Sequence, residues 1–318
     1  MDINQGRRGF IKQLLRNTAL VGAGLWLPVP LFGASSTVKK LTILHTNDTH
    51  SHIEPFPETD RKYPGMGGVV RRKALIEKIR EEEKNVLLLD SGDIFQGTPY
   101  FNFFKGEIEF KAMSAMKYDA ATIGNHDFDN TVEGLEAMLP HADFDFVIAN
   151  YDFSNTAMNG RSRPYKIFEK DKIKVGVFGL GIELEGLVAK GCYMETEYID
   201  PIAVAQEYSS KLRDKEKCDL VICLSHLGYK YDHENESEKV SDIKLAAATE
   251  GIDLILGGHT HTFLDEPVTV TNAKGKEVLI AQVGFGGIKL GRIDFYFDTK
   301  TNGLAWHSTQ DSQVYQIG

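Results

Sequence analysis

Five short apolar runs, each followed closely by polar side chains that can bind a metal ion, constrain the fold of this chain most. The runs span residues 41–45, 86–90, 120–123, 220–224 and 252–256. Mostly apolar runs of this length are typical of β-strands buried on both faces. The polar segments after them lie tens of residues apart, so no single helix can assemble them. They predict an α/β fold in which several strands end at one common site.

The polar segments share a particular set of side chains, namely carboxylates, imidazoles and one amide. They are Asp48-Thr49-His50, Gly92-Asp93, Gly124-Asn125-His126-Asp127, Ser225-His226 and Gly258-His259-Thr260-His261. Such oxygen and nitrogen donors suit Zn, Mn, Fe or Co better than a metal that prefers thiolates. A single histidine or Gly-His turn is weak evidence, because it is often structural. Five segments in order, each after a strand, predict a metal site.

Helix and strand signals alternate along the rest of the chain. We expect helices over residues 68–83, 107–117, 131–139, 200–215 and 237–249. Short β runs are expected over residues 268–271, 278–281, 291–297 and 304–308. The glycine-rich stretches 65–68 and 284–287 lack the Gly-Lys-Ser/Thr ending of a P-loop, and we expect either close backbone approach beside the metals or a plain loop there. No linker divides the chain after residue 40, so we expect one layered α/β domain.

Composition narrows the class of protein. The chain is 42% hydrophobic and 25% charged, as in ordinary globular domains. Its formal net charge of −9 and its lack of a basic patch with interleaved aromatics argue against a nucleic-acid partner. Cys192, Cys218 and Cys223 are the only cysteines, and none lies in a liganding segment. We expect them to be small buried apolar residues rather than disulfides or ligands.

The first 35 residues predict an export signal. Arg7, Arg8 and Lys12 precede an apolar stretch over residues 19–27, and small residues follow at 33–36. The Arg-Arg-x-Phe-Ile-Lys pattern resembles a twin-arginine signal, which predicts a periplasmic or secreted protein. The alternative is a basic amphipathic helix of the mature protein. No apolar run reaches the ~18 residues of a membrane span, so we expect no stable membrane anchor after signal removal.

Four of the motifs carry a family resemblance. They are Thr46-Asn-Asp-Thr-His50, Gly92-Asp-Ile-Phe-Gln-Gly-Thr-Pro-Tyr-Phe101, Gly124-Asn-His-Asp-Phe-Asp129 and Gly258-His-Thr-His261. Together they resemble the 5'-nucleotidase family of calcineurin-like metallophosphoesterases, in order from about residue 40 to the end. The resemblance implies a four-layer αββα sandwich of two mixed sheets flanked by helices. It makes residues 36–318 the metallophosphoesterase catalytic domain.

The resemblance also divides the ligands between two divalent metal ions. Asp48, His50 and His261 complete one ion, while Asn125, His226 and His259 complete the other. Asp93 is expected to bridge the pair, because two nearby cations need a shared anion to offset their repulsion. A tight turn could also exchange the two histidines of the last segment. The donors leave Zn, Mn, Fe and Co open as identities.

Two further residues take catalytic roles by resemblance. His126 is expected to face the leaving-group oxygen without binding metal, and Asp129 to hold its imidazole. We expect Asp127 to be a helix N-cap and His45 to be structural or to support a ligand. The remaining histidines are expected to be surface or packing residues: His52, His141, His233 and His307.

The function implied is a dimetal phosphatase that hydrolyses nucleoside 5'-monophosphates or related small phosphate monoesters by attack of a metal-bridging hydroxide. One alternative is a phosphodiesterase acting on 2',3'-cyclic nucleotides or nucleotide sugars, and another is a non-catalytic binding subunit. The nucleoside-gripping second domain of the family would follow the end of this chain. We therefore expect a catalytic subunit that a separate nucleoside-binding chain completes.

Overall fold

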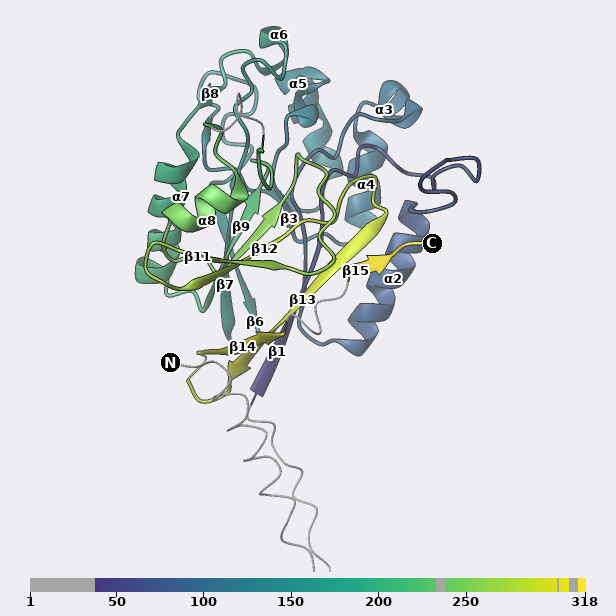
Figure 1. Cartoon of the computed structure of the whole chain (residues 1–318). Helices are drawn as coiled ribbons and strands as arrows, with labels where there is room; N and C mark the ends of the chain where they lie inside the picture. Colours follow the sequence, from purple (N-terminus) through teal and green to yellow (C-terminus); the bar gives the residue numbers. More distant parts are fainter. Residues whose placement is uncertain (1–37, 233–237, 302, 309–313) are drawn as a thin grey trace, which may run out of the picture. The chain divides into compact units, whose positions relative to one another are not determined.

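Two mixed β-sheets, packed face to face, hold the strand ends that the sequence singles out (Figure 1). The computed structural model describes residues 38–232, 238–301, 303–308 and 314–318. Residues 37–318 form one compact unit. The predicted export signal over residues 1–35 lies outside the described residues, as do His233 and the side chain of His307.

The first sheet has seven strands in the order β14-β13-β1-β2-β3-β4, with β15 also paired to β13. Strands β1 to β4 run parallel, whereas β13 is antiparallel to β1, β14 and β15. The bounds are β1 (Val38–Thr46), β2 (Val86–Asp90), β3 (Ala120–Ala121), β4 (Asp145–Phe146), β13 (Lys289–Asp298), β14 (Leu304–Ser308) and β15 (Val314–Gln316).

The second sheet has six strands in the order β11-β12-β10-β9-β7-β6, with antiparallel strands at both edges. Its bounds are β6 (Tyr165–Lys170), β7 (Ile173–Leu180), β9 (Leu220–Ser225), β10 (Leu254–Gly257), β11 (Val268–Thr271) and β12 (Glu277–Ala281). A small separate ribbon pairs β5 (Tyr151–Asp152) with β8 (Glu197–Tyr198).

Helices cover the outer face of each sheet. The α-helices are α2 (Val69–Glu82), α3 (Pro99–Phe104), α4 (Glu107–Ala115), α5 (Thr131–Met138), α6 (Lys190–Tyr193), α7 (Pro201–Ser210) and α8 (Asp242–Ala248). Core residues of α2, α4 and α5 pack with those of the first sheet. Core residues of α7 and α8 pack with those of the second sheet, on the opposite side of the molecule (Figure 1).

Alternation along the strands explains these layers. In β2, Leu87 and Leu89 enter the core between the sheets, while Leu88 enters the core under the helices. In β9, Ile222 likewise faces the other sheet and Val221 faces the helices. Successive side chains of a strand point to opposite faces, so a continuous apolar run fills two cores at once. The predicted four-layer αββα sandwich is confirmed.

The predicted elements are recovered with a few differences. Strand β3 stops at Ala121, two residues before the predicted end of the run, because the chain there turns toward the site. The last predicted helix, 237–249, begins only at Asp242, where the Ser241 side chain caps it. The hairpin of β6 and β7 was not predicted. Its turn uses Asp171 and Lys172 at positive φ, without the Asn-Gly pair that usually marks such turns.

The three cysteines are free thiols. Cys218 and Cys223 are buried as predicted, whereas Cys192 is only partly buried. Within the described ranges, no helix combines the length and the apolar character needed to cross a bilayer.

Candidate metal centre

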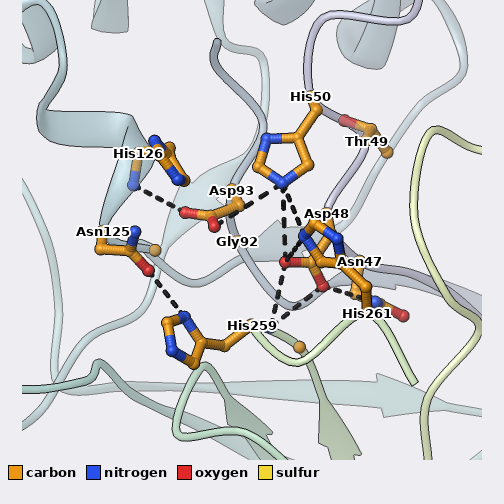
Figure 2. Close-up of polar contacts among 12 residues, drawn as sticks. Asn47, Asp48, Thr49, His50, Gly92, Asp93, Asn125, His126, His259 and His261 are labelled. Carbon is orange, nitrogen blue, oxygen red and sulfur yellow. Dashed lines mark hydrogen bonds and ion pairs between the residues drawn. The ribbon is translucent and has the colours of Figure 1, made fainter. Parts of the chain in front are cut away.

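The site forms where five strands of the two sheets end, so the segments predicted to converge do so (Figure 2). Asp48 follows β1, Asp93 follows β2, and Asn125 follows β3. From the second sheet, His226 comes directly after β9 and His259 soon after β10. Parallel strands bring their carboxyl ends to one edge of a sheet, and the packed sheets bring the two edges together.

Asp48, His50 and His261 make the first candidate group, with potential ligand atoms all within 4.8 Å of one another. The Nε2 atoms of His50 and His261 are 2.9 Å apart. Nε2 of His261 is also 3.4 Å from Oδ1 of Asp48. The Nδ1–H of His50 can donate to the carbonyl of Phe95 at 3.2 Å, which leaves the Nε2 lone pair facing the group.

Asp93, His226 and His259 make the second candidate group, also within 4.8 Å. Nδ1–H of His226 donates to the carbonyl of Ser91 at 2.7 Å. Nε2 of His226 is fully buried and 3.0 Å from Oδ2 of Asp93, but it is not aligned for a hydrogen bond there or elsewhere in the described part. Asn125 joins this group, because its Oδ1 lies 2.8 Å from Nδ1 of His259.

Asp93 lies between the two groups. Its Oδ2 is 3.0 Å from Nε2 of His226 and 3.8 Å from Nε2 of His50. Burial lowers the pKa of His226, but the charge of Asp93 outweighs burial and raises that pKa above its ordinary value. A buried negative field that attracts a proton this strongly also suits a cation.

The backbone at the site is strained. Asp48, His50, Asp93, His259 and His261 all have positive φ, at 49°, 46°, 55°, 70° and 51°. Each such conformation costs a non-glycine residue on the order of 1–3 kcal/mol and persists where the surroundings impose it. Positive φ also occurs at exposed turns such as Asp171 and Lys172, but at the site it falls on five of the predicted ligands.

Glycines make room for the converging side chains. A Cβ at Gly124 would lie 2.2 Å from Oδ1 of Asp93 and 2.7 Å from Cε1 of His226. A Cβ at Gly258 would lie 2.9 Å from Nδ1 of His226. The unpartnered imidazole nitrogen, the carboxylates and this cleared space fit divalent ions at both groups.

His126 and Asp129 form the predicted pair. Nδ1 of His126 lies 2.9 Å from Oδ2 of Asp129, and this hydrogen bond raises the pKa of His126. The backbone N–H of His126 donates to Oδ1 of Asp93 at 2.8 Å. The imidazole belongs to neither ligand group, and its ring centroid is 5.3 Å from that of His50.

The prediction that Asp127 is a helix N-cap was wrong. Its fully buried carboxylate accepts four backbone hydrogen bonds, from the N–H groups of Asp93, Ile94, Phe95 and Gly124 at 2.8–3.1 Å. Through these hydrogen bonds, Asp127 connects the loop that carries Asp93 to the loop that carries His126. Burial and the charge of Asp93 raise its pKa to about 7, while the N–H groups favour the ionised form.

Asp127→Asn is expected to lower the free energy of unfolding of the metal-free chain by about 2–4 kcal/mol. The amide NH₂ would face N–H donors, leaving two or more of them buried without an acceptor. Urea unfolding in the presence of a chelator measures this without the contribution of bound metal. Asp129→Asn is the matched control, because that carboxylate is partly exposed. Equal free energies of unfolding for the two variants would contradict a stabilising role for the hydrogen bonds of Asp127.

His45, His52 and the partly buried His141 belong to neither ligand group. His45 is buried outside both groups, and burial lowers its pKa to about 3, so it is a neutral imidazole. His52 stacks on Phe56 with ring centroids 4.4 Å apart. Gly286 N–H donates to the carbonyl of Asp48 at 2.7 Å, which confirms the close backbone approach expected of the stretch 284–287.

Comparison with known proteins agrees with this geometry. The family model for the calcineurin-like phosphoesterase matches residues 41–263. The chain is 34% identical over 304 residues to snake venom 5'-nucleotidase of Crotalus adamanteus, covering 89% of this chain and 49% of that protein. It is 32% identical over 292 residues to the trifunctional nucleotide phosphoesterase protein YfkN of Bacillus subtilis, covering 82% of this chain and 18% of that protein.

Among solved structures, the 5'-nucleotidase precursor from Thermus thermophilus matches with a TM-score of 0.76 and 32% identity. The match covers 88% of this chain and 55% of that one. The chain therefore spans about half the length of the 5'-nucleotidases it matches. From the matched residues, the sheet arrangement and the two ligand groups, the chain belongs to the calcineurin-like phosphoesterase family, as its motifs predicted.

Proposed function

We propose that this chain hydrolyses nucleoside 5'-monophosphates or related small phosphate monoesters. The observation that carries the proposal is the convergence of two ligand groups with the Asp93 carboxylate between them. Relatives named 5'-nucleotidase, similar over most of this chain, support the substrate class.

Two divalent ions are the cofactors we propose, one at each ligand group. Asp48, His50 and His261 would hold the first ion. His226, His259 and Asn125 would hold the second, and the Asp93 carboxylate between the groups would serve both. Zn, Mn, Fe and Co all accept these donors. When bound, such ions neutralise phosphoryl oxygens and lower the pKa of water.

The protein residues around the ions have separate tasks. Asp129 holds Nδ1 of His126, which leaves Nε2 to donate a proton to the leaving-group oxygen. The backbone bond from His126 to Asp93 fixes the distance between proton donor and ligand groups. Asp127 holds the loop of Asp93 and the loop of His126 together. This division needs no serine or cysteine nucleophile.

A phosphodiesterase acting on 2',3'-cyclic nucleotides or nucleotide sugars is the second candidate. The similarity to a protein named trifunctional nucleotide phosphoesterase favours it. The ligand groups suit either ester, because both reactions displace an alcohol from a phosphoryl group beside two cations.

One substrate panel tests the proposal. Metal-replete protein is assayed with nitrophenyl phosphate, bis(nitrophenyl) phosphate, nucleoside 5'-monophosphates, 2',3'-cyclic nucleotides and nucleotide sugars. Monoesters should be cleaved fastest. Faster cleavage of the diesters would favour the second candidate, and binding without hydrolysis would favour a binding subunit.

The same panel addresses recognition of the base. We propose that recognition of the base lies outside residues 36–318, so that these residues alone have a broad substrate range and a high KM. Binding energy from the remote part of a substrate normally assists catalysis. A preference of roughly 10²-fold in kcat/KM for one nucleotide over nitrophenyl phosphate, about 2.7 kcal/mol, would instead locate base recognition in these residues.

We also propose that residues 1–35 export the catalytic domain, residues 36–318, to the periplasm or beyond by the twin-arginine route. Changing both Arg7 and Arg8 to lysine should leave the protein in the cytoplasm, because the receptor reads the arginine pair. Cell fractionation measures the outcome. Changing Lys12 to arginine, which keeps the pair, is the control. Unchanged periplasmic yield from the double variant would point to ordinary secretion.

A further inference from the structure

Four aromatic rings pack together beside the first ligand group: Phe56, Tyr63, Phe263 and Phe285, here called the aromatic cluster. Phe285 is at its centre, with ring centroids 6.0, 5.6 and 6.1 Å from those of Phe56, Tyr63 and Phe263. Those contacts are all edge-on. One further ring lies parallel to Phe285, and it is the imidazole of His261, at 5.1 Å and 17°.

His261 differs from the other histidines of the two groups. Nδ1 of His50 and Nδ1 of His226 each lies within hydrogen-bond distance of a backbone carbonyl oxygen, and Nδ1 of His259 lies beside Oδ1 of Asn125, another member of its own group. Nδ1 of His261 makes no hydrogen bond to any residue in the described ranges. Its side chain is also 40% exposed, against 7% for His50 and 0% for His226. Neither burial nor a carbonyl therefore fixes this ring.

Stacking on Phe285 fixes the orientation of the His261 ring instead. We infer that Phe285 is a positioning residue, which holds the His261 imidazole with its Nε2 toward Asp48 and His50. An offset parallel ring limits rotation of the imidazole about its side-chain bonds. A hydrogen-bonded oxygen does the same for most metal-binding histidines. The inference rests on the proposed role of His261 as a metal ligand.

The loop that carries Phe285 is tied to the strand end that carries Asp48. Gly286 N–H donates to the carbonyl of Asp48 at 2.7 Å, and Nδ2 of Asn47 donates to the carbonyl of Gly284 at 2.6 Å. A Cβ at Gly284 would lie 2.1 Å from the Phe263 ring, so only glycine lets the cluster close. These hydrogen bonds thus hold Phe285 at a fixed position relative to Asp48 of the first group.

The two ligand groups consequently differ in what holds them. The second group contains the fully buried His226, whose ring is fixed by its hydrogen bond to the carbonyl of Ser91. The first group has one exposed ligand held by a ring stack. Loss of the stack should therefore lower the affinity for the ion at the first group and leave the affinity for the other ion nearly unchanged.

Equilibrium dialysis of the full chain against Co²⁺ measures this. Phe285→Ala should lower the affinity for one of two Co²⁺ ions by about tenfold, as loss of a group that orients a ligand typically does, and change the other by less than about twofold. Phe285→Tyr, which keeps the stack, should behave as wild type. Phe263→Ala is the matched control, because it removes a ring that packs edge-on against Phe285, while the ring stacked on His261 is kept.

A double-mutant cycle with His261→Ala tests the positioning role of Phe285 separately from the proposed role of His261 as a metal ligand. In the His261→Ala background, Phe285→Ala should change neither affinity by more than about twofold, since the ring it positions is gone. Chelator-treated variants are compared by thermal unfolding, and Phe285→Leu replaces any alanine variant that does not fold. Three results would overturn the role of Phe285: wild-type affinities in Phe285→Ala, an equal loss in Phe263→Ala, or a further loss in the double variant. Unchanged affinities in His261→Ala would instead refute the proposed ligand itself.

Discussion

Asp93→Asn is expected to leave a folded chain that has lost most of its bound metal and most of its hydrolytic activity. One oxygen of this carboxylate lies between the two ligand groups: Oδ2 faces Nε2 of His226 and of His50, while Oδ1 accepts the backbone N–H of His126. Asparagine keeps the size but removes the charge between two cations. A loss of roughly 10³-fold in kcat/KM is expected, the upper end of what one preorganised electrostatic group contributes.

Metal analysis after dialysis, together with kcat/KM for nitrophenyl phosphate, measures both losses. Asp171→Asn is the matched control, because it makes the same change at another residue with positive φ, on the exposed turn of the β6–β7 hairpin. It should retain two metals and wild-type turnover. Two metals per chain and near-normal turnover in Asp93→Asn would mean that the ligand groups are wrongly assembled.

Much of this architecture could be predicted from the sequence because two rules act together. Continuous apolar runs such as residues 86–90 belong to strands with a core on each face, and the structure places Leu88 and Leu89 in different cores. The second rule places ligands at the carboxyl ends of such strands. Asp93 and His226 come from different sheets, yet each is identified by the strand just before it.

The missed features depend on contacts that no local pattern encodes. Asp127 follows a Gly-Asn-His turn, where a short polar residue usually caps a helix, but its partners lie some thirty residues earlier in the chain. The sequence shows that residue 127 is an aspartate, but it does not show that the carboxylate is buried. Phe285 lies among glycines for which the sequence predicts a close backbone approach or a plain loop but no ring contact, and its stacking on His261 arises when that loop closes on Asp48.

The β6–β7 hairpin was missed for a different reason. The alternating pattern over residues 165–180 was available, but charged residues interrupt it and its turn lacks glycine. The hairpin matters for the site because the carbonyl of Leu180, at the end of β7, accepts the backbone N–H of His226 at 2.8 Å. The inner strand of this hairpin thus helps to fix the position of His226.

His126→Ala should retain both metals and lose rate by about 10²–10⁴-fold, as removal of a general acid typically does. The side chain belongs to neither ligand group, and the backbone N–H that bonds Asp93 is kept in alanine. The loss should be largest for nucleoside monophosphates, whose alcohol leaving group needs a proton. It should shrink for nitrophenyl phosphate, whose leaving group departs readily as the anion.

Steady-state rates for both substrates, with metal analysis of the same preparation, test this prediction. Asp129→Asn is the companion variant, since it keeps the imidazole and removes the carboxylate that holds it at 2.9 Å. Its loss should follow the same order of substrates but be smaller, because His126 remains able to donate. If His126→Ala instead lost an ion, the imidazole would be a ligand. If both substrates slowed equally, His126 would act on a step other than protonation of the leaving group.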